Sequence, residues 1–368
     1  MIIGIMSMQR IVNYGSFLQA WGLKKTLEET GNEIQFVDFT VQQPLTKKKS
    51  KKKSCLNRLI SMLSPAYRKQ RKIDIKVNRI YSEFVETFTE EYLPLLGVQK
   101  QKNIRPYVDL LVIGSDEVFH CMQPEANVGY SLELFGKDNN AKRVISYAAS
   151  FGSTTLDQIK EKNKEQELAE LLNQFDALSV RDKNSEQIIT QLCDAHPLIH
   201  IDPVLLYDFD KEIPDKVSQK DYIILYSYCG RFTKEEGEAA RNFALSKGKK
   251  LISLGFWQEW CDEYISANPF EVLAYFKHAD YIITDTFHGT VMSIKYNRQF
   301  ICLVRQSNSS KILSLLKDVH LEDRIANTYK EISEKLPIPI NYCWANMHLE
   351  KQQYCAKEYL WEQIKNVQ

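Results

Sequence analysis

A histidine and an aspartate stand close together where an apolar strand pattern ends in the C-terminal part of the chain. The apolar stretch Tyr281–Ile283 is followed by Asp285 and His288, then by an apolar helical pattern and a second strand, Phe300–Leu303. Open α/β sheets hold their ligands at the carboxyl ends of strands, where helix N-termini also point. Histidine gains and loses a proton near neutral pH, so His288 is our first candidate for acid–base chemistry. The alternative is a buried histidine that hydrogen-bonds to a neighbouring strand.

The elements around this stretch repeat the order strand, turn, helix. The chain opens with the strand Ile2–Met6, a turn at residues 13–16, a helical apolar stripe that ends near Gly31, and the strand Ile34–Phe39. Continuous apolar strands are typical of buried parallel sheets. The next four apolar strands end in small or charged residues, as expected of strands that line a crevice: Asp109–Ile113, Arg143–Ala148, Ala177–Val180 and Leu198–Ile201.

A polar spacer, Tyr207–Lys220, separates this series from a second one. The second series contains the strands Tyr222–Tyr228 and Lys250–Leu254, and a helix with Asn268 as its N-cap. A chain of 368 residues exceeds what one hydrophobic core usually organises, so we predict two α/β domains and a last helix that returns to the first domain. The predicted ranges are 1–206 with a helical insertion at 44–95, 207–345, and 346–368 for the last helix.

Composition and charge narrow the class of protein. The chain is 44% hydrophobic and 26% charged, which is typical of a globular protein. Its net charge of +1 argues against a general nucleic-acid binder. No apolar run approaches the ~20 residues of a membrane span, and the apolar N-terminus is too short for a signal peptide, so we expect a cytoplasmic protein. The eight cysteines show no zinc-binding spacing, and we expect reduced thiols and no metal site.

A strongly basic stretch interrupts the first series. Six of the seven residues 47–53 are lysines, and an amphipathic helical pattern follows directly in residues 56–63. A second helix is predicted from the apolar spacing between Ile73 and Phe88. One interpretation of residues 47–79 is peripheral contact with the anionic inner face of a membrane, or with a lipid-linked acceptor. The other is a solvated lysine loop before two helices that face the core.

Six segments of the sequence, taken together, resemble the polysaccharide pyruvyl transferase family. They extend in order over both predicted domains: Asn13-Tyr14-Gly15-Ser16-Phe17-Leu18-Gln19-Ala20, Asp109 through Gly114-Ser115-Asp116, Tyr147-Ala148-Ala149-Ser150-Phe151-Gly152, Ser179-Val180-Arg181-Asp182, Asp202-Pro203-Val204-Leu205-Leu206, and Thr284-Asp285-Thr286-Phe287-His288-Gly289-Thr290. The resemblance implies a GT-B-like fold, with two Rossmann-like domains that face each other across a cleft. It also implies transfer of pyruvate from phosphoenolpyruvate to two hydroxyls of a sugar, which gives a ketal.

This chemistry requires a proton for the enol methylene carbon of the donor, and cations or N–H groups for its phosphate and carboxylate. The resemblance implies that His288 stands at the donor and supplies the proton. Gly289 and Thr290 open the following helix, and we expect their N–H groups to hold the phosphate. Asp285 has two interpretations: it orients His288, or it caps the helix.

Four cations are candidates for binding the donor. Arg181 matches an arginine that the family uses against the donor's charge; the alternative is a surface pair with Asp182. Arg231, Arg305 and Lys311 follow strands or begin a helix in the predicted donor domain. For these three, ordinary surface cations are the alternative.

The acceptor side is predicted in the N-terminal domain. Gly15 and Ser16 lie where the first strand passes into the first helix, and we interpret that turn as a binding loop for the acceptor or a phosphate. Ser115 and Asp116 end a later strand, and the carboxylate of Asp116 or Glu117 could take the proton of the sugar hydroxyl. A helix N-cap is the alternative for Asp116.

One residue departs from the family pattern. Better understood members carry Arg-Leu-His where this chain has Thr286-Phe287-His288, and a hydroxyl cannot replace the charge or the bidentate grip of a guanidinium. Either another cation compensates or the donor differs. Pyruvyl transfer therefore has two competitors: a glycosyltransferase that uses a nucleotide sugar, and a non-catalytic sugar- or anion-binding protein. Apart from phosphoenolpyruvate as donor substrate, the chemistry requires no cofactor.

Overall fold

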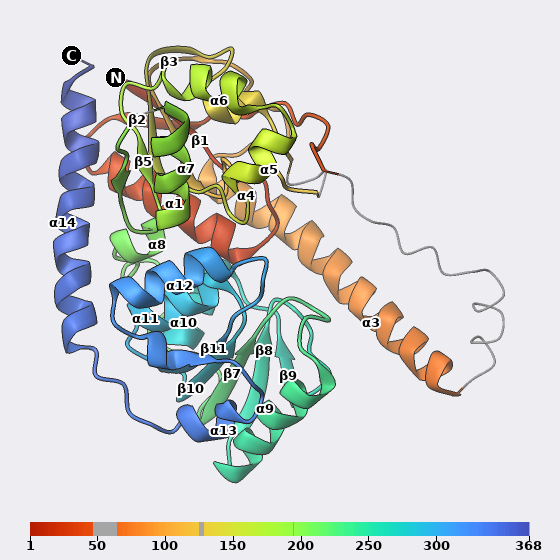
Figure 1. The fold of residues 1–368 in the computed structure, drawn as a ribbon. Helices are drawn as coiled ribbons and strands as arrows, with labels where there is room; N and C mark the ends of the chain where they lie inside the picture. Colours follow the sequence, from red (N-terminus) through yellow and green to blue (C-terminus); the bar gives the residue numbers. More distant parts are fainter. Residues whose placement is uncertain (47–64, 125–128, 194, 368) are drawn as a thin grey trace.

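The computed structural model describes residues 1–46, 65–124, 129–193 and 195–367 of the chain (Figure 1). It contains two six-stranded sheets, one in each half of the chain, and all described strand pairs within them are parallel. Helices pack around both sheets, and residues from both halves line one large cavity. The predicted α/β fold with two Rossmann-like units in a GT-B-like arrangement is confirmed.

The N-terminal sheet has the strand order β2-β1-β3-β4-β5-β6. Its order reverses between β1 and β3, because β2 lies on one side of β1 and all later strands lie on the other. The strands are β1 (Ile2–Met6), β2 (Glu33–Phe36), β3 (Tyr107–Asp116), β4 (Asn140–Ala149), β5 (Ser179–Val180) and β6 (Leu198–Ile199).

Helix α1 (Tyr14–Glu28) follows β1 and lies deep in the molecule. It begins at Asn13, whose side chain accepts a hydrogen bond from the N–H of Ser16. Its residues are buried on nearly all sides, because the sheet covers one face and the C-terminal half covers another. Besides α3 and η1, which are described below, the other described helices of this half are α4 (Leu93–Leu96), η2 (Leu132–Phe135), α5 (Leu156–Glu161), α6 (Glu165–Leu172), α7 (Lys183–Cys193) and α8 (Pro203–Leu206).

The C-terminal sheet has the order β12-β11-β10-β7-β8-β9, which is the strand order of a Rossmann fold. Here the order reverses between β7 and β10. The strands are β7 (Tyr222–Tyr226), β8 (Lys250–Leu254), β9 (Glu263–Ile265), β10 (Tyr281–Thr284), β11 (Gln299–Leu303) and β12 (Ile325–Ala326). The helices are α9 (Lys234–Ser246), α10 (Pro269–His278), α11 (Phe287–Lys295), α12 (Ser309–Asp318), η3 (Glu322–Arg324) and α13 (Glu331–Lys335).

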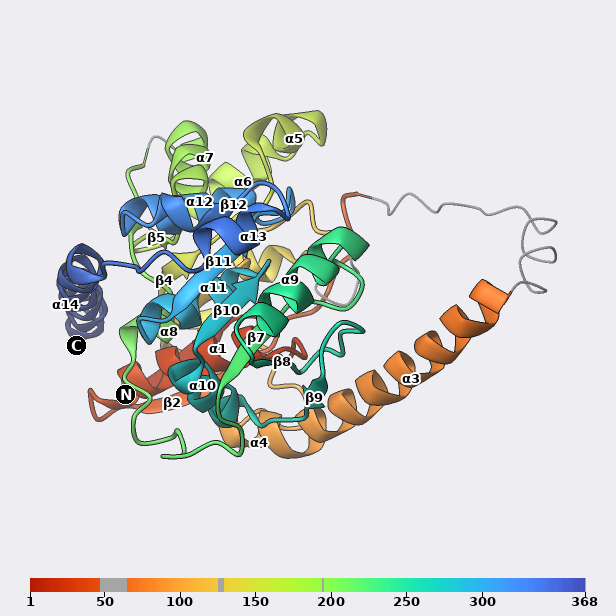
Figure 2. The same ribbon diagram turned by 90° about the horizontal axis from the view of Figure 1, so that it is seen from below.

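The last helix, α14 (Cys343–Lys365), returns to the N-terminal half, as predicted. The hydroxyl of Tyr359 donates a hydrogen bond to the carbonyl of Ser146 in β4 at 2.9 Å, and Gln353 donates to the carbonyl of Leu205 at 2.7 Å. Figures 1 and 2 show α14 along one side of the molecule.

The insertion contributes one long helix on the opposite side. Helix α3 (Pro65–Thr87) continues into η1 (Phe88–Tyr92) and projects beyond the body of the molecule (Figures 1 and 2). This confirms the second helix predicted there. The lysine tract 47–53 and the amphipathic helix predicted at 56–63 lie outside the described residues.

The two halves share an apolar interface built by α1 and α10. The ring of Phe270 lies 5.0 Å from Trp21 and 5.8 Å from Phe17, and the hydroxyl of Tyr14 donates to the carbonyl of Ala267 at 2.5 Å. Burial of such rings contributes about 2 kcal/mol each. This contact fixes the position of α1 at the junction of the halves.

Two strands of the C-terminal sheet are absent from the prediction. β9 and β12 have three and two residues, too few for a periodic pattern to be visible. The helix after Asn268 is as predicted, with a complete capping box to Glu271. Among the described residues, no helix is long and apolar enough to span a membrane.

Candidate functional site

A cavity of about 940 Å³ lies at the carboxyl ends of strands from both sheets. Its wall combines residues of the two halves: Gly15, Ser16, Asp116, Glu117 and His120 from one, Tyr228, Arg231, Thr286, Phe287, His288 and Lys311 from the other, and Val77, Ile80 and Tyr81 from α3.

The cavity is located at both positions where the strand order reverses. Gly15 follows β1 and Asp116 ends β3, the two strands at the reversal of the N-terminal sheet. Tyr228 follows β7 and His288 follows β10, the strands at the reversal of the other sheet. Open α/β sheets bind ligands at these switch points. This position makes the cavity the candidate binding site.

His288 occupies the first turn of α11 and contacts the opposite half of the molecule. Its ring lies against the backbone of Gly15: a Cβ atom there would be 2.1 Å from Nδ1 of His288. Nε2 lies 3.6 Å from Oδ2 of Asp202 and has no hydrogen-bond partner among the described residues. The alternative, a histidine hydrogen-bonded to a neighbouring strand, is not what the structure contains.

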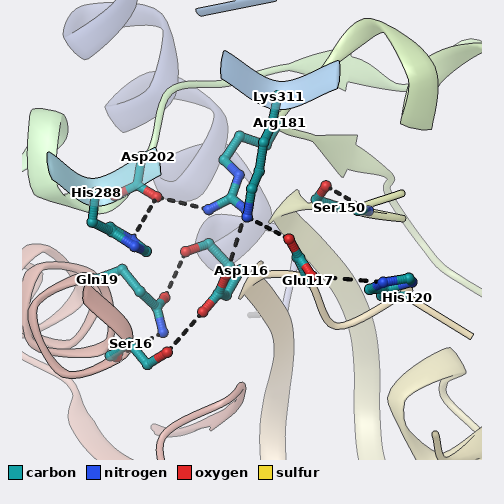
Figure 3. A network of polar contacts seen from close by, with 12 residues as sticks. Ser16, Gln19, Asp116, Glu117, His120, Ser150, Arg181, Asp202, His288 and Lys311 are labelled. Atoms are coloured by element: carbon teal, nitrogen blue, oxygen red, sulfur yellow. Dashed lines mark hydrogen bonds and ion pairs between the residues drawn. The ribbon is translucent and has the colours of Figure 1, made fainter. Parts of the chain in front are cut away.

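Asp202 links His288 to a buried arginine (Figure 3). Arg181 donates from Nη1 to Oδ2 of Asp202 at 2.8 Å and from Nη2 to Oδ1 of Asp116 at 3.4 Å. Burial acts to raise the pKa of Asp202, but His288 and Arg181 outweigh it and lower that pKa to about 2. Asp202 therefore carries a fixed negative charge beside the imidazole.

Asp116 faces the cavity at the end of β3 and is not a helix N-cap, because no helix starts there. Its other carboxylate oxygen accepts a hydrogen bond from Oγ of Ser16 at 3.0 Å. Asp116 has a φ of +75°, a strained conformation for a residue with a Cβ. Two hydrogen bonds hold its carboxylate in that conformation, toward the acceptor side predicted from the sequence.

A second charged group crosses between the halves. The ammonium of Lys311, from α12, pairs with the carboxylate of Glu117, which follows β3. Glu117 lies 3.9 Å from Nε2 of His120. Burial acts to raise the pKa of Glu117, yet Lys311, His120 and Arg181 lower it to about 2. Burial lowers the pKa of His120, which favours a neutral ring beside this ion pair.

Two of these cations lie over the ring of Phe287. The guanidinium of Arg181 lies 4.5 Å from the ring centroid and the ammonium of Lys311 lies 5.1 Å from it. A cation over an aromatic face is attracted by about 0.5 to 2 kcal/mol. Phe287 thus holds positive charge next to His288, on the segment where the family pattern has an arginine and this chain has Thr286.

Arg231 stands at another part of the wall, with its side chain 28% exposed. Its Nη2 donates to Oγ of Ser307 at 2.8 Å, and its guanidinium lies 5.0 Å from the ring centroid of Tyr228. Arg181 does not line the cavity, since it is buried behind Asp116 and Asp202; the predicted alternative of a surface pair with Asp182 is wrong.

The buried Asp285 and the half-buried Arg305 form a structural ion pair instead. Arg305 donates to Asp285 at 3.0 Å and forms two hydrogen bonds of 2.8 Å to Glu236 in α9. Neither Asp285 nor Arg305 lines the cavity. Both interpretations of Asp285 are corrected: the helix cap is Thr286, and the carboxylate next to His288 is that of Asp202.

The predicted phosphate contacts of Gly289 and Thr290 are also corrected. The N–H of Gly289 donates to Oγ1 of Thr286, and the N–H of Thr290 donates to the carbonyl of Thr286, so neither points to the cavity. Ser115 is fully buried, and its hydroxyl donates to Gln19. These three residues support the site from behind.

Asp202 and His120 were not predicted as site residues. Asp202 stands in one of the family-like segments, and that was its only signal in the sequence. His120 follows the Asp116-Glu117 pair by a few residues, but nothing in its spacing indicates that a loop returns it to the cavity wall. Within the described residues, no group of three or more His, Cys, Asp or Glu could hold a metal ion, and their cysteines are unpaired.

Comparisons with known proteins give one family and several distant structures. A family model described as polysaccharide pyruvyl transferase matches residues 13–307. No curated protein matches the chain. The structure is similar to that of UDP-GlcNAc 2-epimerase from Neisseria meningitidis, with 9% identity, 99% of each chain covered and a TM-score of 0.48. Arabidopsis thaliana UGT89C1 is also similar, with 11% identity, 100% of this chain and 97% of that chain covered, and a TM-score of 0.47. A UDP-GlcNAc 2-epimerase from Methanocaldococcus jannaschii has 11% identity, with 93% of each chain covered and a TM-score of 0.44.

Proposed function

Because the chain belongs to the polysaccharide pyruvyl transferase family, we propose that it transfers the pyruvyl group of phosphoenolpyruvate to two hydroxyls of a sugar. The sugar is part of a surface polysaccharide or of its lipid-linked precursor. The observation that carries the proposal is the position of His288 in the cavity wall, with the charged Asp202 behind it and the Asp116 carboxylate in the facing half.

In this reaction His288 is the general acid. Its proton goes to the methylene carbon of phosphoenolpyruvate, which becomes a methyl group, while a sugar hydroxyl attacks the neighbouring carbon. The carboxylate of Asp202, 3.6 Å from Nε2, holds the imidazole in position for that step. Asp116 accepts the proton of the attacking hydroxyl, and Ser16 and Arg181 hold its carboxylate for this role.

The ketal forms when the second hydroxyl replaces the phosphate. Loss of phosphate breaks one carbon–oxygen bond and leaves a carbocation that the remaining oxygen stabilises. The second sugar hydroxyl adds to that carbon, and its proton leaves with the phosphate. The proton taken up by Asp116 balances the proton given by His288. For each phosphate released, two carbon–oxygen bonds and one carbon–hydrogen bond form.

Lys311 and Arg231 supply the positive charge for the donor. Both line the cavity from the same half as His288. Lys311 is paired with Glu117, and Arg231 donates to Ser307 and lies 4.0 Å from a carboxylate oxygen of Asp285. Phosphate and carboxylate are bound by such charge-assisted hydrogen bonds. These two cations account for the absence of an arginine at Thr286.

The proposal is tested by measuring phosphate release from phosphoenolpyruvate in the presence of candidate sugar acceptors. We expect release to depend on both substrates, and His288→Ala to reduce its rate about 100-fold or more, as loss of a general acid does. The matched control is His278→Ala, an exposed histidine on α10 outside the cavity. It should leave the rate unchanged.

Thermal shift separates this reaction from its competitors. Phosphoenolpyruvate alone should raise the melting temperature, since it binds the folded state only. Stabilisation by nucleotide sugars without any effect of phosphoenolpyruvate would instead indicate a glycosyltransferase. A response to sugars alone, with no phosphate release, would indicate a non-catalytic binding protein.

A further inference from the structure

The outward face of α14 carries an unusual set of large apolar side chains. Trp344, Met347, Tyr354 and Trp361 are 49%, 64%, 62% and 37% exposed. Their spacing of three and seven residues puts them in one row along the helix. His320 and Lys357 lie against the rings of Trp344 and Trp361 at the two ends of the row, and much of each side chain in the row remains exposed. Figures 1 and 2 show the helix at the margin of the molecule. An ordered apolar row of this kind marks an interaction surface.

The helix is held firmly by its other face. Leu349, Ala356 and Leu360 are buried against the body, and Lys357 pairs with Glu29 of the N-terminal half at 2.8 Å. The first residue of the row, Trp344, is also held in place, because its ring is stacked on that of His320 with the centroids 4.7 Å apart. The row is therefore a rigid surface, which binds at a lower entropic cost than a flexible one.

Two opposite charges interrupt the row on either side of its centre. Lys351 and Glu358 are both exposed and stand about one turn before and one turn after Tyr354. The hydroxyl of Tyr354 donates to Glu358, which fixes that carboxylate within the row. A surface with a cation and an anion placed symmetrically about its centre is complementary to itself when rotated by 180°.

We propose that α14 pairs in an antiparallel manner with α14 of a second copy of this chain, about a two-fold axis next to Tyr354. This arrangement places Lys351 of each copy opposite Glu358 of the other, and brings the Trp344 end of one helix to the Trp361 end of its partner. Parallel pairing would place like charges opposite each other, which is destabilising. The cavity stays free, because it lies toward α3 on the far side of the molecule.

Charge also argues against a membrane as the occupant of this face. Its exposed charged residues are Glu350, Lys351, Glu358, Glu362 and Lys365, three acids and two bases. Interfacial helices that bind anionic lipids are instead rich in Lys and Arg on their polar face.

The test uses charge reversal at the two central positions. The unmodified protein should be a dimer by sedimentation velocity and light scattering. Lys351→Glu and Glu358→Lys should each weaken dimerisation about tenfold or more, because both contacts of the pair become repulsive. An equimolar mixture of the two variants should regain the dimer as a heterodimer, since both contacts then again join a glutamate to a lysine. The control Glu238→Lys, at an exposed position of α9, should remain dimeric.

Three results would overturn the proposal. The unmodified protein could be a monomer at every concentration tested. The single variants could dimerise as well as the unmodified protein, which would place the interface elsewhere. The mixture could also stay monomeric. Recovery in the mixture excludes misfolding as the reason for the monomers, because two misfolded variants would not restore each other.

Discussion

At the residue scale, the contact between Gly15 and His288 sets the position of the proposed acid. The glycine leaves room for the imidazole at the start of α1, and no other residue type fits without displacing the ring. The Asp202 carboxylate then limits the ring from its other edge. A small change at position 15 is therefore expected to act on catalysis through His288.

We predict that Gly15→Ala lowers the rate of phosphate release about 100-fold, since a displacement of 1 Å in a catalytic group has such effects. It should also lower the melting temperature. In the His288→Ala background the same substitution should cost much less stability, because the clash at 2.1 Å is gone. The measurement is a double-mutant cycle of melting temperatures. Equal costs in both backgrounds would show that the methyl group does not meet this ring.

His288, Asp116 and Lys311 were predicted from the sequence as site residues, because each stands at or near a strand end or a helix start. Asp202 could not be assigned its role, since its contact to His288 joins the two halves and no local pattern encodes it. Asp285 was misplaced for the same reason. Its proximity to His288 in the sequence suggested a partner, whereas the folded chain pairs it with Arg305.

At the element scale, the first turn of α11 combines two tasks. Thr286 caps the helix through Gly289, and Phe287 presents its ring to Arg181 and Lys311. The polar site thus depends on an apolar side chain of this element. Phe232 makes a comparable cation–π contact outside the cavity, because its ring lies 5.4 Å from the guanidinium of Arg305.

We predict that Phe287→Leu raises the KM for phosphoenolpyruvate about threefold to tenfold, from the loss of the cation–π attraction that holds Lys311. The control is Phe232→Leu, which removes an equally buried ring under a cation outside the cavity. The control should lose similar stability and keep its KM. Initial-rate kinetics distinguish the two, and equal KM values would refute a role of the ring in donor binding.

Helices and strands with a clear period were predictable from the sequence. The strand Lys250–Leu254 and the capped helix after Asn268 appear where the apolar pattern and the cap place them. The strands β9 and β12 could not be predicted, because strands of two or three residues form only when a neighbouring strand pairs with them. The prediction that the N–H of Gly289 binds a phosphate was wrong, because that N–H donates to the hydroxyl of Thr286.

At the scale of the whole molecule, the buried carboxylates join the halves and make stability depend on pH. Glu117 has an ordinary pKa of 4.5 that is lowered to about 2, and that of Asp202 is lowered from 3.8 to about 2. A lowered pKa means that the folded state favours the charged form. The stability that these groups contribute is complete above about pH 4.5 and is lost as pH falls toward 2.

We predict that Glu117→Gln lowers the free energy of unfolding near neutral pH by about 3 kcal/mol, because it leaves the charge of Lys311 without its partner. The difference from the unmodified protein should shrink between pH 4.5 and 2, where Glu117 itself becomes neutral. Urea unfolding at a series of pH values measures this. The exposed control Glu238→Gln should show no such convergence. A difference that persists at pH 2 would contradict the assignment.

The order of the two sheets and the return of the last helix have a consequence for motion. The chain passes between the halves at residues 207–221 and again before α14, and both passages lie on the side that carries α8 and α14, away from α3 (Figures 1 and 2). We therefore expect any opening of the cavity to occur on the side of α3, opposite these two connections. Under the proposed function, we expect a sugar acceptor to enter and leave on the side of α3, with the bulk of a long acceptor on that side.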